Sequence, residues 1–477
     1  ARLNRCFGTF QKSDIQNVAI HEMTHQVADR LVRPAAVAPD IDNDGIAVTS
    51  VTDGTMVRDL LACWRSVNFN FQRLLFIVLL AILCYLVLPP LFFTIQSSLY
   101  VERGFNEPEL SLKNYSDFFS TPDTAALLAN SIWFALGSSL VALTLGTLLA
   151  WVVERTDTPF KNLAYMSAFT SFAIPGIVKV IGWIMLFGPE KGILNVWLKD
   201  LFQLQNSPFN IFTLTGMILV EGVVWAPVVF LFMAAPFRSM DPSLEESALM
   251  SGAGPVQTFF HVTFKLALPS VLSVLLLTFV RAMEAFEIPV LIGIPGRVLV
   301  LTSEIYLRLS GGLLPQYGMA SAYGVVLIAL VSFGLYFYAR ATRESQKFYT
   351  ITGKGFRPRT IEMGRWRYLT TTIVFVLPTL LALPLLILTW ISVLPYYMAP
   401  SLEALKQLTT VNYSAAFQSP NVWLALKNSL IISLSSASLT MLLTAVIAWV
   451  VVRSNISGRR ILEHLTSFTL AFPSVVL

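Results

Sequence analysis

Five residues near the N-terminus have the types and spacing of a zinc hydrolase. In His21-Glu22-Met23-Thr24-His25, two imidazoles one helical turn apart flank a glutamate that could act as a base. Such a site also needs a third ligand and a surrounding folded domain. The only other histidines are His261 and His464, and the segment that carries the motif is polar and short. We therefore predict no metal site and no cofactor.

A nucleotide site is the second chemistry that the sequence can be searched for. A phosphate-binding loop has the pattern Gly-x4-Gly-Lys-Ser/Thr, which does not occur in this sequence. Gly353-Lys354-Gly355 lacks both the upstream glycine spacing and the hydroxyl residue. We therefore predict that the chain is not an enzyme, and that any ATP hydrolysis belongs to a separate subunit.

A third group consists of charges inside long apolar segments. Ionisable residues inside membrane spans are costly, and they usually face a protein interior or a water-filled path. Arg281 and Glu284 are three residues apart and can pair on one helix face. The sequence leaves two roles open, mutual neutralisation between helices and lining of a pathway. The candidate pathway residues are Lys179, Glu221, Arg281, Glu284 and Glu287.

The composition places these residues in a lipid bilayer. Of 477 residues, 55% are hydrophobic and 13% are charged, and the mean hydropathy of +0.66 exceeds what a water-soluble fold requires. The net charge of +5 comes from basic residues in short loops rather than on one soluble face, so we predict no nucleic-acid partner. Cys6, Cys63 and Cys84 are too few and too scattered for a disulfide framework.

Apolar stretches of about 20 residues, the length of one membrane-spanning helix, recur along the chain. They predict an all-α, polytopic membrane protein. A ninth span has just begun where the sequence ends at Leu477. The first eight predicted spans cover residues 74–96, 127–153, 163–187, 216–235, 270–293, 318–338, 369–394 and 424–452.

The distribution of basic residues predicts the orientation of these spans. Residues 340–367 form a linker with a large excess of arginine and lysine, and short loops of this kind stay in the cytoplasm. The polar tail, residues 1–72, is then also cytoplasmic, and the loop between the fourth and fifth spans lies on the same side.

An internal repeat divides the chain into two modules. Asn114 and Tyr115 recur as Asn412 and Tyr413, an offset of 298 that continues without a gap through later polar and proline landmarks, Arg155 with Arg453 among them. Because six spans separate the copies, both have the same orientation and form a parallel repeat. We expect a first module at residues 73–339 and a second, truncated module at residues 368–477.

The loop of residues 236–269 contains a compact helix-turn-helix. Asp241-Pro242 is a strong helix start, and Gly252 and Gly254 are expected to end that short helix. Pro255 can open a second helix that runs to about Thr263. The loop is predicted to lie on the cytoplasmic face of the membrane.

This loop resembles the cytoplasmic signature of type I ABC importer permeases, which reads Glu-Ala-Ala, three residues, Gly, nine residues, then Ile-x-Leu-Pro. Glu246-Ser247-Ala248 and Gly252 match it with one change, and Val262 takes the Ile position. Phe264-Lys265 replaces the Leu-Pro pair, and Pro269 follows shortly afterwards. The coupling residues that this resemblance implies are Glu245, Glu246, Ser247, Ala248, Gly252, Val262 and Pro269.

The resemblance implies a tandem pair of six-helix modules of the type I importer fold, set in a bacterial inner membrane with the N-terminus in the cytoplasm. Its first short loop helix would couple to separate ABC ATPase subunits, and an external substrate-binding protein would deliver the substrate. Residues 281–289 and 352–359 look like those of fused ferric-iron importer permeases. Polyamine, thiamine and phosphonate permeases are relatives. A secondary transporter driven by an ion gradient remains the alternative of a different class.

Overall fold

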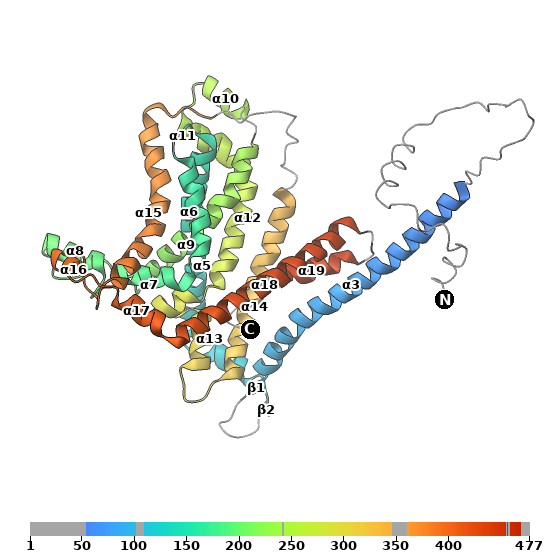
Figure 1. Cartoon of the computed structure of the whole chain (residues 1–477), viewed down its shortest axis with the longest axis horizontal. Helices are drawn as coiled ribbons and strands as arrows, with labels where there is room; N and C mark the ends of the chain where they lie inside the picture. The colour runs from blue at the N-terminus through green and yellow to red at the C-terminus, as the bar shows by residue number, and fades with distance from the viewer. Residues whose placement is uncertain are drawn as a thin grey trace, which may run out of the picture. The chain divides into compact units, whose positions relative to one another are not determined.

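The computed structural model describes residues 54–101, 109–240, 243–345, 360–454, 456 and 458–468, and most of them are helical (Figure 1). Among these described residues the only strands are β1 (Tyr100–Val101) and β2 (Glu109–Leu110), which pair antiparallel. The predicted all-α class is confirmed. The helices are α3 (Gly54–Ser98), α4 (Lys113–Ser120), α5 (Thr124–Arg155), α6 (Lys161–Ala173), α7 (Gly176–Phe187), α8 (Ile193–Phe202), α9 (Leu214–Ser239), α10 (Ser243–Met250), α11 (Pro255–Thr258), the π-helix η1 (Phe259–Thr263), α12 (Phe264–Met283), the π-helix η2 (Pro289–Gly293), α13 (Leu301–Ser310), α14 (Tyr317–Ser345), the 3-10 helix η4 (Gly364–Trp366), α15 (Arg367–Ser392), α16 (Leu402–Lys406), α17 (Val411–Gln418), α18 (Pro420–Arg453) and α19 (Arg459–Phe468).

Seven helices in the described part of the chain are long and apolar enough to cross a membrane, or eight spans result if the bent pair of α6 and α7 counts as one. The chain is therefore a multi-pass membrane protein, as predicted. The seven are α3, α5, α9, α11 with η1 and α12 as one continuous helix, α14, η4 with α15, and α18.

The third predicted span, residues 163–187, was wrong as a single straight helix. It is broken between α6 and α7, whose axes differ by 106°. Pro175 explains the break, because it has no N–H to donate and its ring disfavours helical geometry at the preceding residue. Ile174 accordingly has extended backbone, with φ −93° and ψ 122°.

The fifth predicted span, residues 270–293, is displaced toward the N-terminus. α12 ends at Met283, and the chain leaves the helix before η2 begins at Pro289. In an unbroken helix Pro289 could not donate to the carbonyl of Ala285. In the structure, the Ala285 carbonyl accepts a hydrogen bond from Thr302 Oγ1 at 2.7 Å, so it still has a partner despite the break.

The predicted tail, residues 1–72, is not a separate segment over its whole length. α3 begins at Gly54 and continues without interruption into the first span, Phe71–Ser98. The histidine motif at residues 21–25 and most of the central linker, residues 346–359, lie outside the described residues.

By backbone contacts the chain forms two compact units, residues 1–81 with 446–460, and residues 82–445 with 461–477. At the centre of the larger unit α5 packs closely along α9, with α6, α12 and α15 beside them (Figure 1). Glycines permit this approach, since a Cβ on Gly146 would lie 2.6 Å from Val229 Cβ. Small residues serve the same purpose in other membrane helix pairs.

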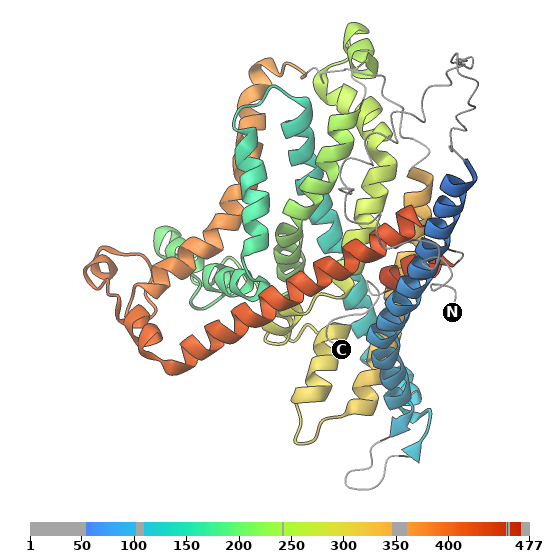
Figure 2. The same ribbon diagram turned by 45° about the vertical axis from the view of Figure 1, so that its right-hand side comes forward.

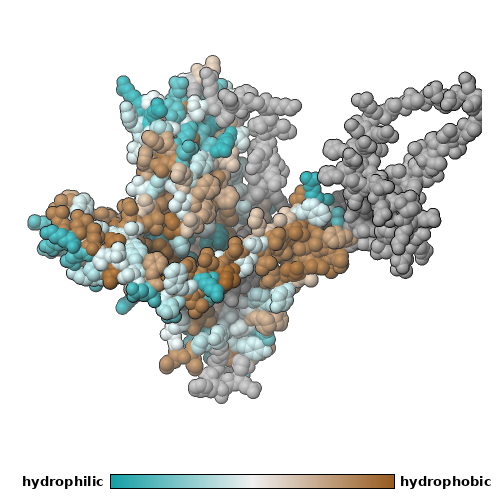
Figure 3. Space-filling view, in the orientation of Figure 1, coloured by the Kyte–Doolittle hydropathy of each residue, from teal (hydrophilic) through white to brown (hydrophobic). Residues whose placement is uncertain are grey.

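The short helix α10 caps one end of this bundle in both ribbon views (Figures 1 and 2). On the face shown in Figure 3, hydrophilic side chains gather at the end of the bundle that carries α10, and hydrophobic ones cover the helices below it. This pattern fits a bundle that crosses a membrane and exposes α10 to water.

Candidate functional site

The loop helix α10 has the local structure that its sequence predicts. Glu245 and Glu246 lie in its first turn, where negative charge is favourable at a helix N-terminus. The helix ends at Met250, and Gly252 follows with φ +89°. No heavy atom lies within 4 Å of a Cβ built on Gly252, so the left-handed backbone rather than crowding requires glycine there. The predicted turn at Gly252 is confirmed.

The continuation after this turn differs from the sequence prediction. The second short helix does not stop near Thr263, because α11, η1 and α12 follow one another without a break from Pro255 to Met283. The loop therefore passes directly into a spanning helix.

Glu245 points into the protein, where it meets Arg155 at the end of α5. Arg155 Nε donates to Glu245 Oε2 at 3.1 Å, and Nη2 forms an ion pair with the same oxygen. The exposed fractions of the two side chains are 0% and 3%. A buried ion pair needs its remaining polar atoms satisfied, because both charges have lost their water.

Neighbouring segments supply the remaining hydrogen bonds of this ion pair. Arg155 Nη1 donates to the carbonyls of Phe237, at 3.5 Å, and Met240, at 3.3 Å, at the end of α9. Thr263 Oγ1 donates to Glu245 Oε1 at 2.6 Å. We call Arg155, Glu245 and Thr263 the coupling anchor. It joins the end of α5, the end of α9, α10 and the start of α12.

The other predicted coupling residues lie around this anchor rather than in it. Ser247 and Gly252 are exposed, and Ser247 Oγ donates to the carbonyl of Ser243 at 2.7 Å within α10. Six large hydrophobic side chains of the same loop are also exposed, those of Leu244, Met250, Val256, Phe260, Leu266 and Leu268. Side chains that are half-buried belong to Glu246, Ala248, Val262 and Pro269.

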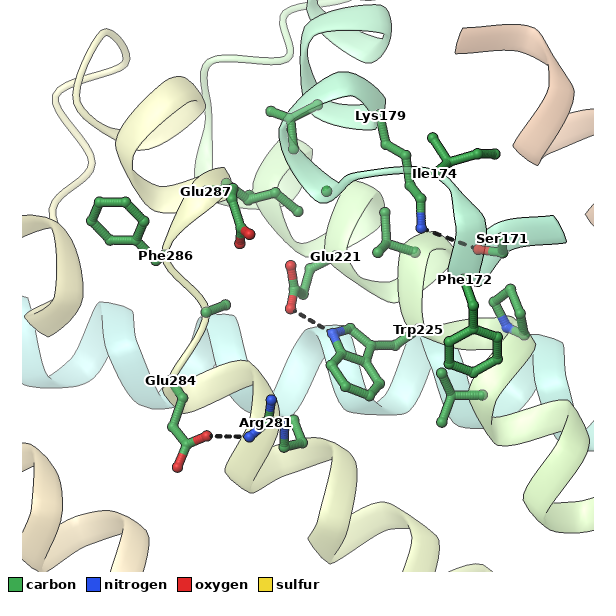
Figure 4. A pocket seen from close by; sticks show the side chains of 17 residues that line it. Ser171, Phe172, Ile174, Lys179, Glu221, Trp225, Arg281, Glu284, Phe286 and Glu287 are labelled. Carbon is green, nitrogen blue, oxygen red and sulfur yellow. Dashed lines mark hydrogen bonds and ion pairs between the residues drawn. The ribbon is translucent and has the colours of Figure 1, made fainter. Parts of the chain in front are cut away.

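All five candidate pathway residues line one pocket of about 360 Å³ in the larger unit (Figure 4). Its walls come from α6, α7, α9 and α12 and from the non-helical segment after α12. Both helix breaks, at residues 174–175 and 284–286, border it. Irregular backbone at membrane depth is tolerated where it lines a cavity or is buried in protein.

The charged groups in the pocket are partly paired (Figure 4). Arg281 Nη1 donates to Glu284 Oε2 at 2.7 Å, and its guanidinium carbon lies 5.8 Å from the centre of the Trp225 ring. Lys179 Nζ donates to Ser171 Oγ at 3.2 Å rather than to a carboxylate.

Two further carboxylates face each other across the pocket, those of Glu221 and Glu287 (Figure 4). Trp225 Nε1 donates to Glu221 Oε1 at 2.9 Å. Glu287 lies over the first turn of α7, since a Cβ on Gly176 would lie 3.1 Å from Glu287 Oε1. The pocket thus offers carboxylate oxygens, two cations and an indole to a polar ligand.

Sequence reasoning missed three residues that the structure places in these sites. Arg155 was noted as a landmark of the repeat, but nothing local identified its partner 90 residues away. Thr263 is an ordinary helix residue by its surroundings in sequence. Trp225 stands four residues after Glu221, a spacing at which helical side chains meet, and that signal could have been used.

The chain is similar to known membrane transport proteins. Residues 142–344 match the model of the family described as binding-protein-dependent transport system inner membrane component. A putative ferric transport system permease protein, FbpB 1, of Haemophilus influenzae is 23% identical over 86% of this chain and 62% of its own length. The ferric transport system permease protein FbpB of Actinobacillus pleuropneumoniae is 23% identical over 73% of this chain and 50% of its own.

Other relatives are named for different substrates. The spermidine/putrescine transport system permease protein PotB of Haemophilus influenzae is 24% identical over 58% of this chain and 96% of its own. A crystal structure of a bacterial ABC transporter for alginate import aligns with a TM-score of 0.47 at 20% identity, over 61% of this chain and all of that one. The chain spans 50% to 62% of the two ferric permeases. Together, the family and ferric-permease matches confirm the predicted resemblance to type I ABC importer permeases.

Proposed function

We propose that this chain forms the substrate path of an ABC importer in the bacterial inner membrane and couples that path to ATP hydrolysis by separate subunits. The coupling anchor carries the proposal, because it ties an exposed loop helix to the ends of α5 and α9 through a buried, hydrogen-bonded ion pair. A loop that only connects two spans does not need such an anchor, whereas a loop that transmits force must be held firmly to the helices that it moves.

The exposed face of α10 is the proposed ATPase contact. Ser247, Gly252 and the hydrophobic side chain of Met250 lie on the outside of the loop, where a partner can reach them. Glu245, one of the predicted coupling residues, has a different role in this proposal. It holds the helix to the membrane bundle, while the exposed residues bind the ATPase.

The pocket is the proposed section of the substrate path. Lys179, Glu221, Arg281, Glu284 and Glu287 bring charge into the middle of apolar helices, and such charge lines a route or pairs within the protein. The pairing of Arg281 with Glu284 is compatible with both roles, since Glu221 and Glu287 still face the cavity.

Ferric iron is the proposed substrate, supported by the two ferric permeases among the relatives. The polyamine permease, and the putative 2-aminoethylphosphonate permease PhnU of Salmonella typhimurium at 27% identity, supply the alternatives. We further propose two modules at residues 73–339 and 368–477, a cytoplasmic N-terminus, and an external substrate-binding protein as partner.

Uptake by inner-membrane vesicles tests this function against its rivals. Vesicles that hold the intact transporter, with its ATPase and binding protein, are given radioactive ferric iron, spermidine or 2-aminoethylphosphonate. We expect ATP-dependent uptake of iron that persists when ionophores collapse the ion gradients. Uptake that requires an ion gradient and does not depend on ATP would instead indicate a secondary transporter. ATP-dependent uptake of spermidine or 2-aminoethylphosphonate would support an ABC importer but contradict ferric iron as its substrate.

A further inference from the structure

Residues 361–370, which are the end of the linker and the first turn of α15, lie directly against the end of α5. The N–H of Ile361 donates to the carbonyl of Arg155 at 2.8 Å, and the N–H of Asp157 donates to the carbonyl of Ile361 at 3.2 Å. Thr156 and Ile361 thereby form a parallel bridge. We call residues 155–158 together with 361–370 the linker clasp.

Side chains reinforce this backbone pairing. The N–H of Met363 donates to Asp157 Oδ1 at 3.1 Å, and Thr158 Oγ1 donates to Thr370 Oγ1 at 2.6 Å. Both threonines are buried. Ile361 and Met363 are buried too, in the same hydrophobic cluster as residues of α5 and α9. Buried hydrogen bonds in a packed cluster hold one geometry, because each broken bond leaves an unsatisfied polar group.

Arg155 belongs to the clasp and to the coupling anchor at once. Its carbonyl accepts from the linker, while its guanidinium binds Glu245 of α10. Three residues beyond the clasp's first contact, η4 begins and leads directly into α15. The loop helix and the first helix of the proposed second module are therefore fixed to the same residue.

α15 in turn reaches the pocket through α7. A Cβ on Gly182 would lie 2.6 Å from Pro384 Cβ, so the two helices touch with no side chain between them at this point. Gly182 lies one turn after Lys179, which lines the pocket. A continuous set of packed contacts runs from α10 through Arg155 and the clasp to α15, and then to α7.

We propose that the linker clasp is a relay that carries the movement of α10 to α15 and so to the pocket, with Asp157 and Thr158 as its positioning residues. This inference rests on the proposed function. The clasp makes the linker part of the coupling machinery rather than a passive tether. For coupling, the contacts of residues 361–370 with α5 are then more important than the segment 346–359 that precedes them.

The test uses the complete transporter in proteoliposomes and measures ferric iron taken up per ATP hydrolysed. Thr158→Val removes the hydroxyl at nearly constant shape, and Thr158→Ser keeps it. The matched control is Thr371→Val, since the hydroxyl of the half-buried Thr371 donates to the carbonyl of Arg367 in its own helix and not to α5. We expect Thr158→Val to lower uptake per ATP about threefold to tenfold, the range of one net hydrogen bond. Thr158→Ser and Thr371→Val should match the unaltered chain.

A second pair of variants covers the case in which Thr158→Val does not fold. Asp157→Ala removes the acceptor of the Met363 N–H, whereas Asp157→Asn keeps an oxygen in the same place. We expect Asp157→Ala alone to lower uptake per ATP. An unchanged ratio in both Thr158→Val and Asp157→Ala overturns the relay, as does a proportional loss of uptake and hydrolysis. If the unaltered transporter shows no ATP-dependent uptake, the proposed function itself fails.

Discussion

Removing one partner of the coupling anchor should destabilise the chain far more than removing a surface ion pair. In Arg155→Met, Glu245 loses the Arg155 Nε donor at 3.1 Å and its ion-pair partner, and the carbonyls of Phe237 and Met240 lose theirs. Only the bond from Thr263 remains to the buried carboxylate. Breaking a buried ion pair on one side costs about 3–5 kcal/mol, because the remaining charge has no water and no partner.

The measurement is the free energy of unfolding of the detergent-purified chain in a denaturant titration. Arg155→Met and Glu245→Met should each lose about 3–5 kcal/mol, and the double variant should lose less than the two together, since no lone charge is left. The control is Arg238→Met, which breaks an ion pair with Glu154 near the same end of α5. The Arg238 side chain is 60% exposed, and Glu154, which is 10% exposed, keeps the hydrogen bond that it accepts from Tyr165 Oη. Arg238→Met should cost about 1 kcal/mol or less. Additive losses, or single variants no worse than the control, would refute the anchor.

Three further perturbations test the bundle, the loop and the pocket. Gly146→Val should prevent close packing of α5 on α9, because its Cβ position is 2.6 Å from Val229 Cβ, and folded yield by size-exclusion fluorescence should fall. Gly252→Val forces a β-branched residue to φ +89°, a strain of about 1–3 kcal/mol, and should abolish uptake while the chain still inserts; normal uptake contradicts the coupling role. Glu284→Gln and Glu287→Gln should lower uptake more than they lower binding of the ATPase. In a second pair of variants, with cysteine at each position, a water-soluble thiol reagent should react with both. Labelling that reports only lipid exposure excludes them from the path.

The sequence was most informative where a local pattern determines local structure. Apolar stretches about as long as a bilayer is thick predicted the spans, and glycine at residue 252 predicted a turn that requires positive φ. Charges inside apolar segments were named because they are costly in lipid, and all five line one pocket. In each case the signal lies within about 20 residues, the length of one span.

Contacts between distant segments were not predictable in the same way. Nothing near Arg155 indicates that its carbonyl meets Ile361 while its side chain meets Glu245, since both pairings depend on how α5, α9 and α15 pack. The two helix breaks are an intermediate case. Pro175 and Pro289 were visible, but proline is tolerated inside spans, as Pro227 within α9 shows. Hydropathy alone could not distinguish a kink from a break.

The two helix breaks are tolerated for the same reason, because both border the same pocket. A break in a spanning helix frees backbone groups that lipid cannot satisfy, so it persists only against protein or water. Here the break at residues 174–175 and the one at residues 284–286 both border the same cavity, and Glu287, just after the second break, lies over the first turn of α7, just after the first. The freed N–H groups at the start of α7 favour a nearby carboxylate. Since α7 is also held by α15 through the contact of Gly182 with Pro384, the break gives α7 a hinge on its pocket side. The clasp then gives α15 a fixed point at the coupling end, so the arrangement can turn a small shift at α10 into a change of pocket shape.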